Sequence, residues 1–270
     1  MSRRLIAASA LVLAATVLAA CSGGAAPQAT APSGAADDLG LVKAGTLTVA
    51  TEGTYRPFSF HADGGTGDLT GFDVEIIQAV GDRLGLTVEF QETQWDAIFA
   101  GLDGGRFDVI ANQVSINPQR EANYLFSTPY TVSPGVIVVR EDDNSITSFA
   151  DLNGKTTAQS LTSNWYQLAT DSGARVEAVE GWAQAVALLR QGRVDATVND
   201  RLTFLDYETT DGPTGLKVAA ETDEAGRQAF AFTRDKQALV TAVDGALAAL
   251  RADGTLAEIS NKYFGADVTE

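Results

Sequence analysis

The chain has 270 residues, of which 45% are hydrophobic and 20% are charged, a composition typical of a soluble globular protein. This length predicts one large domain or two lobes. The formal net charge of −16 argues against a nucleic-acid partner and against electrostatic binding to anionic lipid. The single cysteine excludes an internal disulfide.

The first twenty residues have the pattern of an export signal. The basic start "MSRR" precedes the apolar run "LIAASALVLAATVLAA", and small residues lie before Cys21. An apolar run of that length could also be a membrane anchor, but the basic start and the small residues favour cleavage. We therefore predict that residues 1–20 are a signal peptide. The Ala-, Gly-, Ser- and Pro-rich composition predicts a flexible tether up to residue 40, with Cys21 at its start.

From Thr46 onward, β-rich segments alternate with segments that have helical periodicity. Strands are expected at "TLTVATEG" (46–53), "LTVEFQET" (86–93) and "FDVIANQV" (107–114). Helices are expected between them at "GFDVEIIQAVGDRLG" (71–85), which ends at a glycine, and at "WDAIFAGLDGG" (95–105). This alternation predicts parallel βαβ units.

A second α/β series follows. Strands are expected at 135–141, 156–160, 174–180 and 194–200, and helices at 148–155, 164–173, 182–193 and 201–209. Two further helices, 237–254 and 256–265, complete the chain and could cover the first lobe. We therefore predict an α/β protein with a discontinuous first lobe (41–132 plus 230–270) and a second lobe (133–229). Two crossing strands would join the lobes, and a ligand would bind in the cleft between them.

The segment "NQVSINPQR" contains an arginine at an unfavourable place. Asn117 fits the N-cap of a helix and Pro118 its first position, so Arg120 falls near the third. The helix dipole disfavours a cation there by roughly 0.3–1 kcal/mol. An anion bound by both the guanidinium and the helix start would explain this arginine. The alternative is a surface arginine that pairs with Glu121 or another acid.

Five segments occur together in a characteristic order: "TEGTYRPFSF", "GFDVEIIQAV", "GRFDVIANQVSINPQR", "FSTPYT" and "GRVDATVND". With them the chain resembles the bacterial extracellular solute-binding proteins of family 3, over residues 46–265. "ANQVSINPQREANYLFSTPYT" and the ending "FGADVT" are most similar to the cystine-binding members. In addition, "LAAC" resembles the lipobox of bacterial lipoproteins, which implies lipidation of Cys21, for example with palmitate. The alternative is a lone cysteine at an ordinary signal-peptide junction.

The resemblance implies a periplasmic-binding-protein fold of type II and a function. The protein would be the extracytoplasmic component of an amino-acid ABC importer, close its lobes on a polar amino acid such as L-cystine, and present it to permease subunits. We expect a monomer without cofactor or metal, held by lipid at the outer face of the cytoplasmic membrane, at the cell surface or in the periplasm. The alternatives are another polar amino acid such as glutamine, a ligand-sensing module, or a dehydratase-type enzyme on this fold. The single histidine, His61, lies in a Gly-rich loop and offers little support for an enzyme.

The resemblance also implies residue roles for the charged ends of an amino acid. Arg120 would bind the α-carboxylate, Thr162 and Ser163 would complete that site from the second lobe, and Asp200 would bind the α-ammonium. For Thr162 and Ser163 the alternative is N-capping of the following helix. For Asp200 it is capping of the helix that begins at Arg201, or pairing with that arginine.

The remaining candidates lie in the first lobe. Gln113 and Ser115 alternate along a predicted strand and should point to one face. The Gln113 carbonyl would then accept from the ammonium, and Ser115 would donate to the carboxylate unless it only caps the strand. The other candidates are Asn112, the acid Glu52 near the amine, and the apolar walls Tyr55, Phe58 and Trp95, with core packing as the alternative for the walls.

Overall fold

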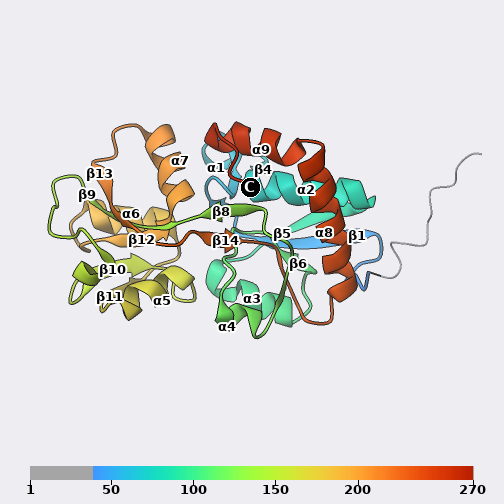
Figure 1. Ribbon diagram of the computed structural model, residues 1–270, viewed down its shortest axis with the longest axis horizontal. Helices are drawn as coiled ribbons and strands as arrows, with labels where there is room; N and C mark the ends of the chain where they lie inside the picture. The colour runs from blue at the N-terminus through green and yellow to red at the C-terminus, as the bar shows by residue number, and fades with distance from the viewer. Residues whose placement is uncertain (1–38, 270) are drawn as a thin grey trace, which may run out of the picture. The chain divides into compact units, whose positions relative to one another are not determined.

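The computed structural model describes residues 39–269, in which a five-stranded sheet and four smaller sheets are flanked by helices (Figure 1). The signal peptide expected at residues 1–20, Cys21 and nearly all of the tether lie outside these described residues. Among the helices of residues 39–269, none combines the length and the apolar character that crossing a membrane requires.

The first sheet has the strand order β5-β1-β6-β15-β7. Its strands are β1 (Thr46–Thr51), β5 (Thr87–Glu92), β6 (Val109–Ile110), β7 (Leu125–Phe126) and β15 (Ala231–Phe232). Strand β1 runs parallel to both β5 and β6, which confirms the predicted βαβ units, whereas β15 is antiparallel to β6 and β7.

Helices cover both faces of this sheet because the side chains of β1 alternate between two apolar clusters. Leu47 and Val49 belong to the cluster that α2 (Phe72–Leu84), α8 (Gln237–Ala252) and α9 (Thr255–Phe264) complete. Ala50 belongs to the cluster of α3 (Trp95–Asp103) on the other face. Helix α2 ends at Gly85 as predicted, since its φ of 69° is the left-handed conformation that glycine adopts without strain.

The second lobe contains a comparable sheet in two hydrogen-bonded parts. Strands β10 (Thr156–Gln159) and β11 (Arg175–Ala178) are parallel, and an isolated bridge from Thr157 to Ala196 joins them to the second part. There β9 (Gly135–Arg140) pairs antiparallel with both β12 (Thr197–Asp200) and β13 (Leu216–Glu221). The expectation of parallel pairing is therefore wrong for β9. Strand β9 continues from the preceding strand and not from a crossover helix, so nothing constrains it to run parallel.

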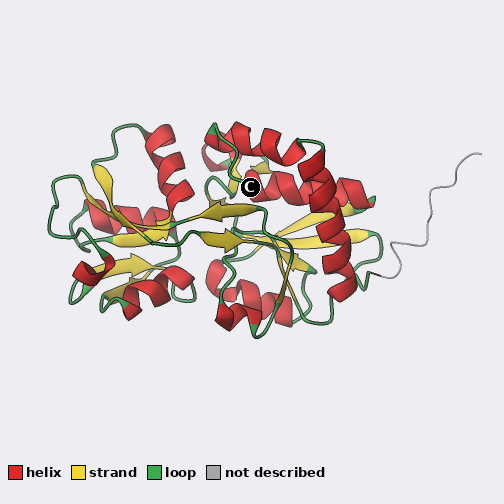
Figure 2. Cartoon of the chain, viewed as in Figure 1, coloured by secondary structure: helices red, strands yellow, loops and turns green. Residues whose placement is uncertain are grey.

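Two short strands carry the chain between the lobes. Strands β8 (Thr131–Ser133) and β14 (Gly226–Gln228) pair antiparallel, and Figure 2 shows them as adjacent arrows between the two groups of elements. The lobe limits predicted from the sequence remain a proposal.

The other elements are short or flank the cleft. They are β2 (Thr54–Tyr55), β3 (Ser59–His61), β4 (Leu69–Thr70), α1 (Ala62–Gly65), α4 (Pro118–Glu121), the 3₁₀ helix η1 (Phe149–Leu152), α5 (Asn164–Asp171), α6 (Trp182–Arg190) and α7 (Arg201–Asp211).

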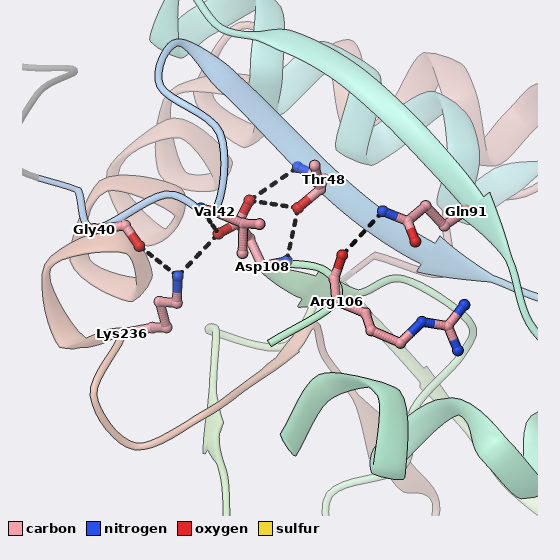
Figure 3. Close-up of polar contacts among 7 residues, drawn as sticks. All are labelled: Gly40, Val42, Thr48, Gln91, Arg106, Asp108 and Lys236. Carbon is pink, nitrogen blue, oxygen red and sulfur yellow. Dashed lines mark hydrogen bonds and ion pairs between the residues drawn. The ribbon is translucent and has the colours of Figure 1, made fainter. Parts of the chain in front are cut away.

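A buried charge pair fastens the start of the described chain to the first sheet (Figure 3). Asp108 is fully buried and accepts from Val42 N at 2.8 Å, from Thr48 N at 3.0 Å and from Thr48 Oγ1 at 2.6 Å. The Lys236 ammonium lies 2.9 Å from Asp108 Oδ1 and also donates to the carbonyl of Gly40. One carboxylate thus joins the segment before β1, strand β1 itself and the loop before α8.

We expect Lys236→Met to lower the free energy of unfolding by about 2 kcal/mol, because the fully buried Asp108 would lose its only ionic partner among residues 39–269. Urea denaturation of the purified protein measures this change. Lys43→Met is the matched control, since the Lys43 side chain is 58% exposed and pairs with Glu89 at the surface. It should change the free energy of unfolding by less than about 0.5 kcal/mol. Equal losses in the two variants would contradict the role given to Lys236.

Candidate functional site

Two cavities lie next to each other where the lobes meet. We call the first the tryptophan cavity; its lining residues are Glu52, Thr54, Tyr55, Trp95, Asn112, Gln113, Ser163, Asn164, Trp165, Gly181, Trp182 and Asn199. We call the second the arginine cavity; it is lined by Phe99, Asn117, Gln119, Arg120, Asn123, Tyr124, Leu161, Thr162, Ser163, Asn164, Tyr166 and Gln167. Ser163 and Asn164 line both cavities, so the two are neighbours across the start of α5.

Arg120 is a buried cation that no acid neutralises. Its side chain is only 8% exposed, and none of the ion pairs among residues 39–269 includes it. Arg120 Nη1 donates to the carbonyl of Ser115 at 2.8 Å, and the guanidinium carbon lies 5.2 Å and 5.3 Å from the ring centres of Trp95 and Phe99. Burial lowers the pKa of Arg120 to about 10, so the group stays charged at neutral pH. A buried, unpaired guanidinium is costly unless an anion joins it.

The helix that carries Arg120 begins as predicted, with Asn117 at the N-cap and Pro118 in its first turn. However, α4 is a single turn of four residues, and Asn117 Oδ1 accepts from the Arg120 backbone N–H at 2.9 Å. Glu121 N and Ala122 N donate to the carbonyls of Asn117 and Pro118. The expected set of free helix N–H groups beside Arg120 is therefore largely used up inside the turn. The guanidinium itself is the group left for an anion.

Thr162 contacts a carboxylate, but one that belongs to the protein. Its backbone N and Oγ1 both donate to Asp96 Oδ1, at 3.0 Å and 2.8 Å. The N-cap of α5 is Ser163, whose Oγ accepts from Tyr166 N at 3.0 Å. Capping, the alternative left open by the sequence, is thus the observed role of Ser163. Thr162 instead joins α3 of the first lobe to the start of α5.

Asp200 is the acidic counterpart of Arg120. It is fully buried, and no ion pair among residues 39–269 includes it. Asp200 Oδ1 caps α7 by accepting from Leu202 N at 2.8 Å and also accepts from Ser133 Oγ at 2.5 Å. Burial raises the pKa of Asp200 to about 6. Arg201 does not pair with it, since Arg201 Nε lies 3.2 Å from Glu221 Oε1.

Gln113 does not lie on a regular strand, so the predicted alternation with Ser115 is wrong. Strand β6 ends at Ile110, and Gln113 has a φ of 50°, a left-handed conformation that is uncommon for a residue with a side chain. Its backbone N–H donates to the buried carboxyl of Asp73, which also accepts from the Tyr130 hydroxyl at 2.6 Å. With the backbone of Gln113 held by Asp73, Gln113 Nε2 donates to Asp200 Oδ2 at 3.2 Å. The carbonyl of Ser115, two residues later, accepts from Arg120.

Glu52 and Asn112 form one unit at the end of β1. Asn112 Nδ2 donates to Glu52 Oε2 at 2.6 Å, and Asn112 Oδ1 accepts from Glu52 N at 2.9 Å and from Thr51 Oγ1 at 3.1 Å. Burial is the largest cause that raises the pKa of Glu52 to about 7. Asn112 therefore positions an acid whose pKa burial has moved close to neutral.

The three predicted wall residues differ in their places. Trp95 is 8% exposed and lines the tryptophan cavity, as does Tyr55. Phe58 is fully buried in the core, where its ring packs against those of Tyr55, Phe72 and Phe264. Its expected place in the cavity wall is thus corrected to core packing, because the side chain is fully buried in the core cluster of the first lobe.

Other residues of the site were not found from the sequence. Tyr55 Oη donates to Asn199 Oδ1 at 2.9 Å and accepts from Thr203 Oγ1 at 3.2 Å, so a first-lobe aromatic is bonded to the second lobe. Trp165 and Trp182, each in the first turn of a helix, line the tryptophan cavity. The signal that could have found Trp182 is a large aromatic directly after a glycine at a predicted helix start.

The site can therefore bind a small molecule that carries both charges. It contains the buried cation Arg120 and the buried acid Asp200, neither of which has an ionic partner among the described residues. An anion at Arg120 and an ammonium at Asp200 would complete both environments, as an α-amino acid can.

Comparison with known proteins gives a consistent result. The model of the bacterial extracellular solute-binding proteins, family 3, matches residues 47–266. A "Probable amino-acid ABC transporter-binding protein" of Haemophilus influenzae is 52% identical over 228 residues, which cover 84% of this chain and 88% of that protein. The L-cystine-binding protein TcyA of Bacillus subtilis is 52% identical over 230 residues, 85% of each chain.

A solved structure is similar as well. The L-cystine solute receptor of Neisseria gonorrhoeae, in its unliganded open conformation, is 44% identical with a TM-score of 0.57. The match covers 83% of this chain and 95% of that one.

Proposed function

Because this chain belongs to the bacterial extracellular solute-binding proteins, family 3, we propose that it binds L-cystine and delivers it to an ABC importer. The observation that carries the proposal is the pair of buried charges without ionic partners, Arg120 and Asp200. In this proposal Arg120 binds the α-carboxylate of the amino acid and Asp200 its α-ammonium. Cystine is the first candidate because a 52%-identical relative binds it.

Binding would work by closure of the two lobes around the ligand. Contacts that join the lobes include Thr162 with Asp96, Tyr55 with Asn199, and Gln113 with Asp200. The TM-score of 0.57 to an open receptor, at 44% identity, is consistent with lobes that are in contact here and apart there. Closure would present the filled cleft to permease subunits.

The partners and the location follow from the same proposal. The chain would act as a monomeric binding protein and not as an enzyme. Export by a signal peptide at residues 1–20 and lipidation of Cys21 would hold it at the outer face of the cytoplasmic membrane. A single acyl chain binds membranes only weakly, so stable anchoring would need more than one.

A thermal-shift panel of the protein amino acids plus L-cystine tests the function. At about 100 times its dissociation constant, the correct ligand stabilises the folded state by about 2.7 kcal/mol, and we expect L-cystine to give the largest shift. Absence of a shift with every amino acid would contradict the proposal. A larger shift with glutamine would change the ligand but keep the function, and turnover of any ligand into a product would favour an enzyme.

A further inference from the structure

All three tryptophans of the chain line the tryptophan cavity, and for two of them no residue within 39–269 accepts from the indole N–H. Trp95 Nε1 and Trp182 Nε1 are buried and make no hydrogen bond with any described residue. Buried tryptophans normally find an acceptor, and each exception in a native structure calls for an explanation. Two unpaired indole N–H groups on the wall of one cavity indicate that a ligand with hydrogen-bond acceptors enters this cavity.

The two tryptophans also mark two helix starts at this cavity. Trp95 is the first residue of α3 and Trp182 is the first residue of α6, and both helices are nine residues long. Neither helix has a side-chain cap, since Gln94 and Gly181 occupy the N-cap positions without a side-chain hydrogen bond. At the start of α3 the carboxylate of Glu52 already accepts from the Trp95 backbone N–H. A helix N-terminus favours negative charge, so the start of α6 and the two indole N–H groups remain to select a ligand carboxylate.

The same cavity also presents acceptors. Gln113 is 6% exposed, and its Oε1 is buried without a hydrogen-bond partner, while its Nε2 already donates to Asp200. Glu52 lines the cavity beside it and is held by Asn112. An ammonium would find both an amide oxygen and a carboxylate here.

We propose that the tryptophan cavity receives a second zwitterionic end of the ligand: Trp95 and Trp182 donate to its carboxylate, and Gln113 and Glu52 accept from its ammonium. The proposal rests on the proposed function, in which Arg120 and Asp200 bind the first end. It makes the protein selective for an amino acid that carries two α-amino-acid groups, as L-cystine does.

The arrangement of Trp182 suits a specificity role. Its ring meets those of Phe204 and Tyr207 edge-on, with centroid distances of 6.5 Å and 5.7 Å, so it is packed from the second lobe. Trp95 is packed from the first lobe, edge-on against Phe99 at 5.7 Å. Two donors from opposite lobes can meet one carboxylate only when the lobes are closed, so the far end of the ligand would also favour closure.

Titration calorimetry with three ligands tests the proposal. L-cystine and L-cystathionine have two zwitterionic ends, whereas S-methyl-L-cysteine has only one. We expect Trp182→Phe, and independently Trp95→Phe, to weaken binding of both two-ended ligands by about tenfold, the size of one hydrogen bond to a charged group. Binding of S-methyl-L-cysteine should weaken by less than about threefold, because it does not reach the indole N–H groups.

Trp165→Phe is the matched comparison, since Trp165 lines the same cavity but its N–H is not among the buried unpaired atoms. Its effect should be the same for one-ended and two-ended ligands. Equal losses for all three ligands in the Trp182 and Trp95 variants, or no loss for L-cystine, would overturn the proposal. Equal affinity of the unmodified protein for S-methyl-L-cysteine and L-cystine would do so too. Failure of the unmodified protein to bind any amino acid would instead refute the proposed function.

Discussion

Arg120→Ala is expected to weaken binding of every α-amino acid by at least about 1,000-fold. The ligand carboxylate would lose a bidentate, charge-assisted contact and would remain buried without a cation, which costs about 4 kcal/mol. The fold should survive, because the bond that caps α4 uses the backbone N–H of residue 120, which alanine keeps. Calorimetry with L-cystine measures the loss.

Two further variants sharpen this experiment. Arg120→Lys keeps the charge but not the planar fork, so we expect it to recover only part of the affinity. Arg106→Ala, at an exposed arginine of the same lobe, should bind like the unmodified protein. If Arg120→Ala bound amino acids as tightly as Arg106→Ala, the carboxylate site would lie elsewhere.

Asp200→Asn is expected to weaken binding by about 100-fold or more, because the ligand ammonium would be buried without a formal negative charge. Asparagine is as good an N-cap as aspartate, so the start of α7 should be kept. In the unmodified protein Gln113 Oε1 has no hydrogen-bond partner among the described residues. In the variant the Gln113 side chain can rotate so that Oε1 accepts from the amide introduced at position 200. Calorimetry with an analogue that lacks the amine is the complement: it should bind the unmodified protein poorly and should be insensitive to Asp200→Asn.

The affinity for the ligand should depend on pH through the ionisation of the Asp200 carboxyl. Burial raises the pKa of Asp200 to about 6 in the ligand-free protein, and only the ionised form can pair with an ammonium. Affinity should therefore fall by about tenfold as the pH is lowered from about 7.5 to about 5, where roughly one molecule in ten is ionised. Glu52, with a pKa of about 7, titrates nearby, so Glu52→Gln separates its contribution. An affinity that rose on acidification would contradict the assignment.

Many of the helices and strands could be predicted because they depend on the pattern of apolar residues within a short segment of the sequence. Strand β1 and helices α2, α3 and α8 follow from the period of their apolar residues, and each forms where that period predicts it. Pairing direction could not be predicted in the same way. The antiparallel pairs of β9 with β12 and β13 depend on strands that are distant in the sequence, and no local pattern records them.

The same distinction applies to the site. The cap of α4 was predicted because Asn117, Pro118 and Arg120 are neighbours in the chain. The end of β6 was not, because Asp73, forty residues away, holds the backbone of Gln113 in a left-handed conformation. Trp182 was missed because a tryptophan at a helix start is ordinary until its N–H proves to be buried without a partner.

By itself, the sequence determined the α/β alternation, the family resemblance and the residue types that can bind an amino acid, since periodicity and short motifs are local properties. Only the tertiary structure decided which charges remain without ionic partners. Among residues 39–269, Arg120 and Asp200 are buried and form no ion pair, whereas Asp108 is buried and paired with Lys236. The physical reason is that ion pairing and desolvation depend on which side chains the fold brings together. Those side chains are distant in the sequence, so no short segment predicts their contacts.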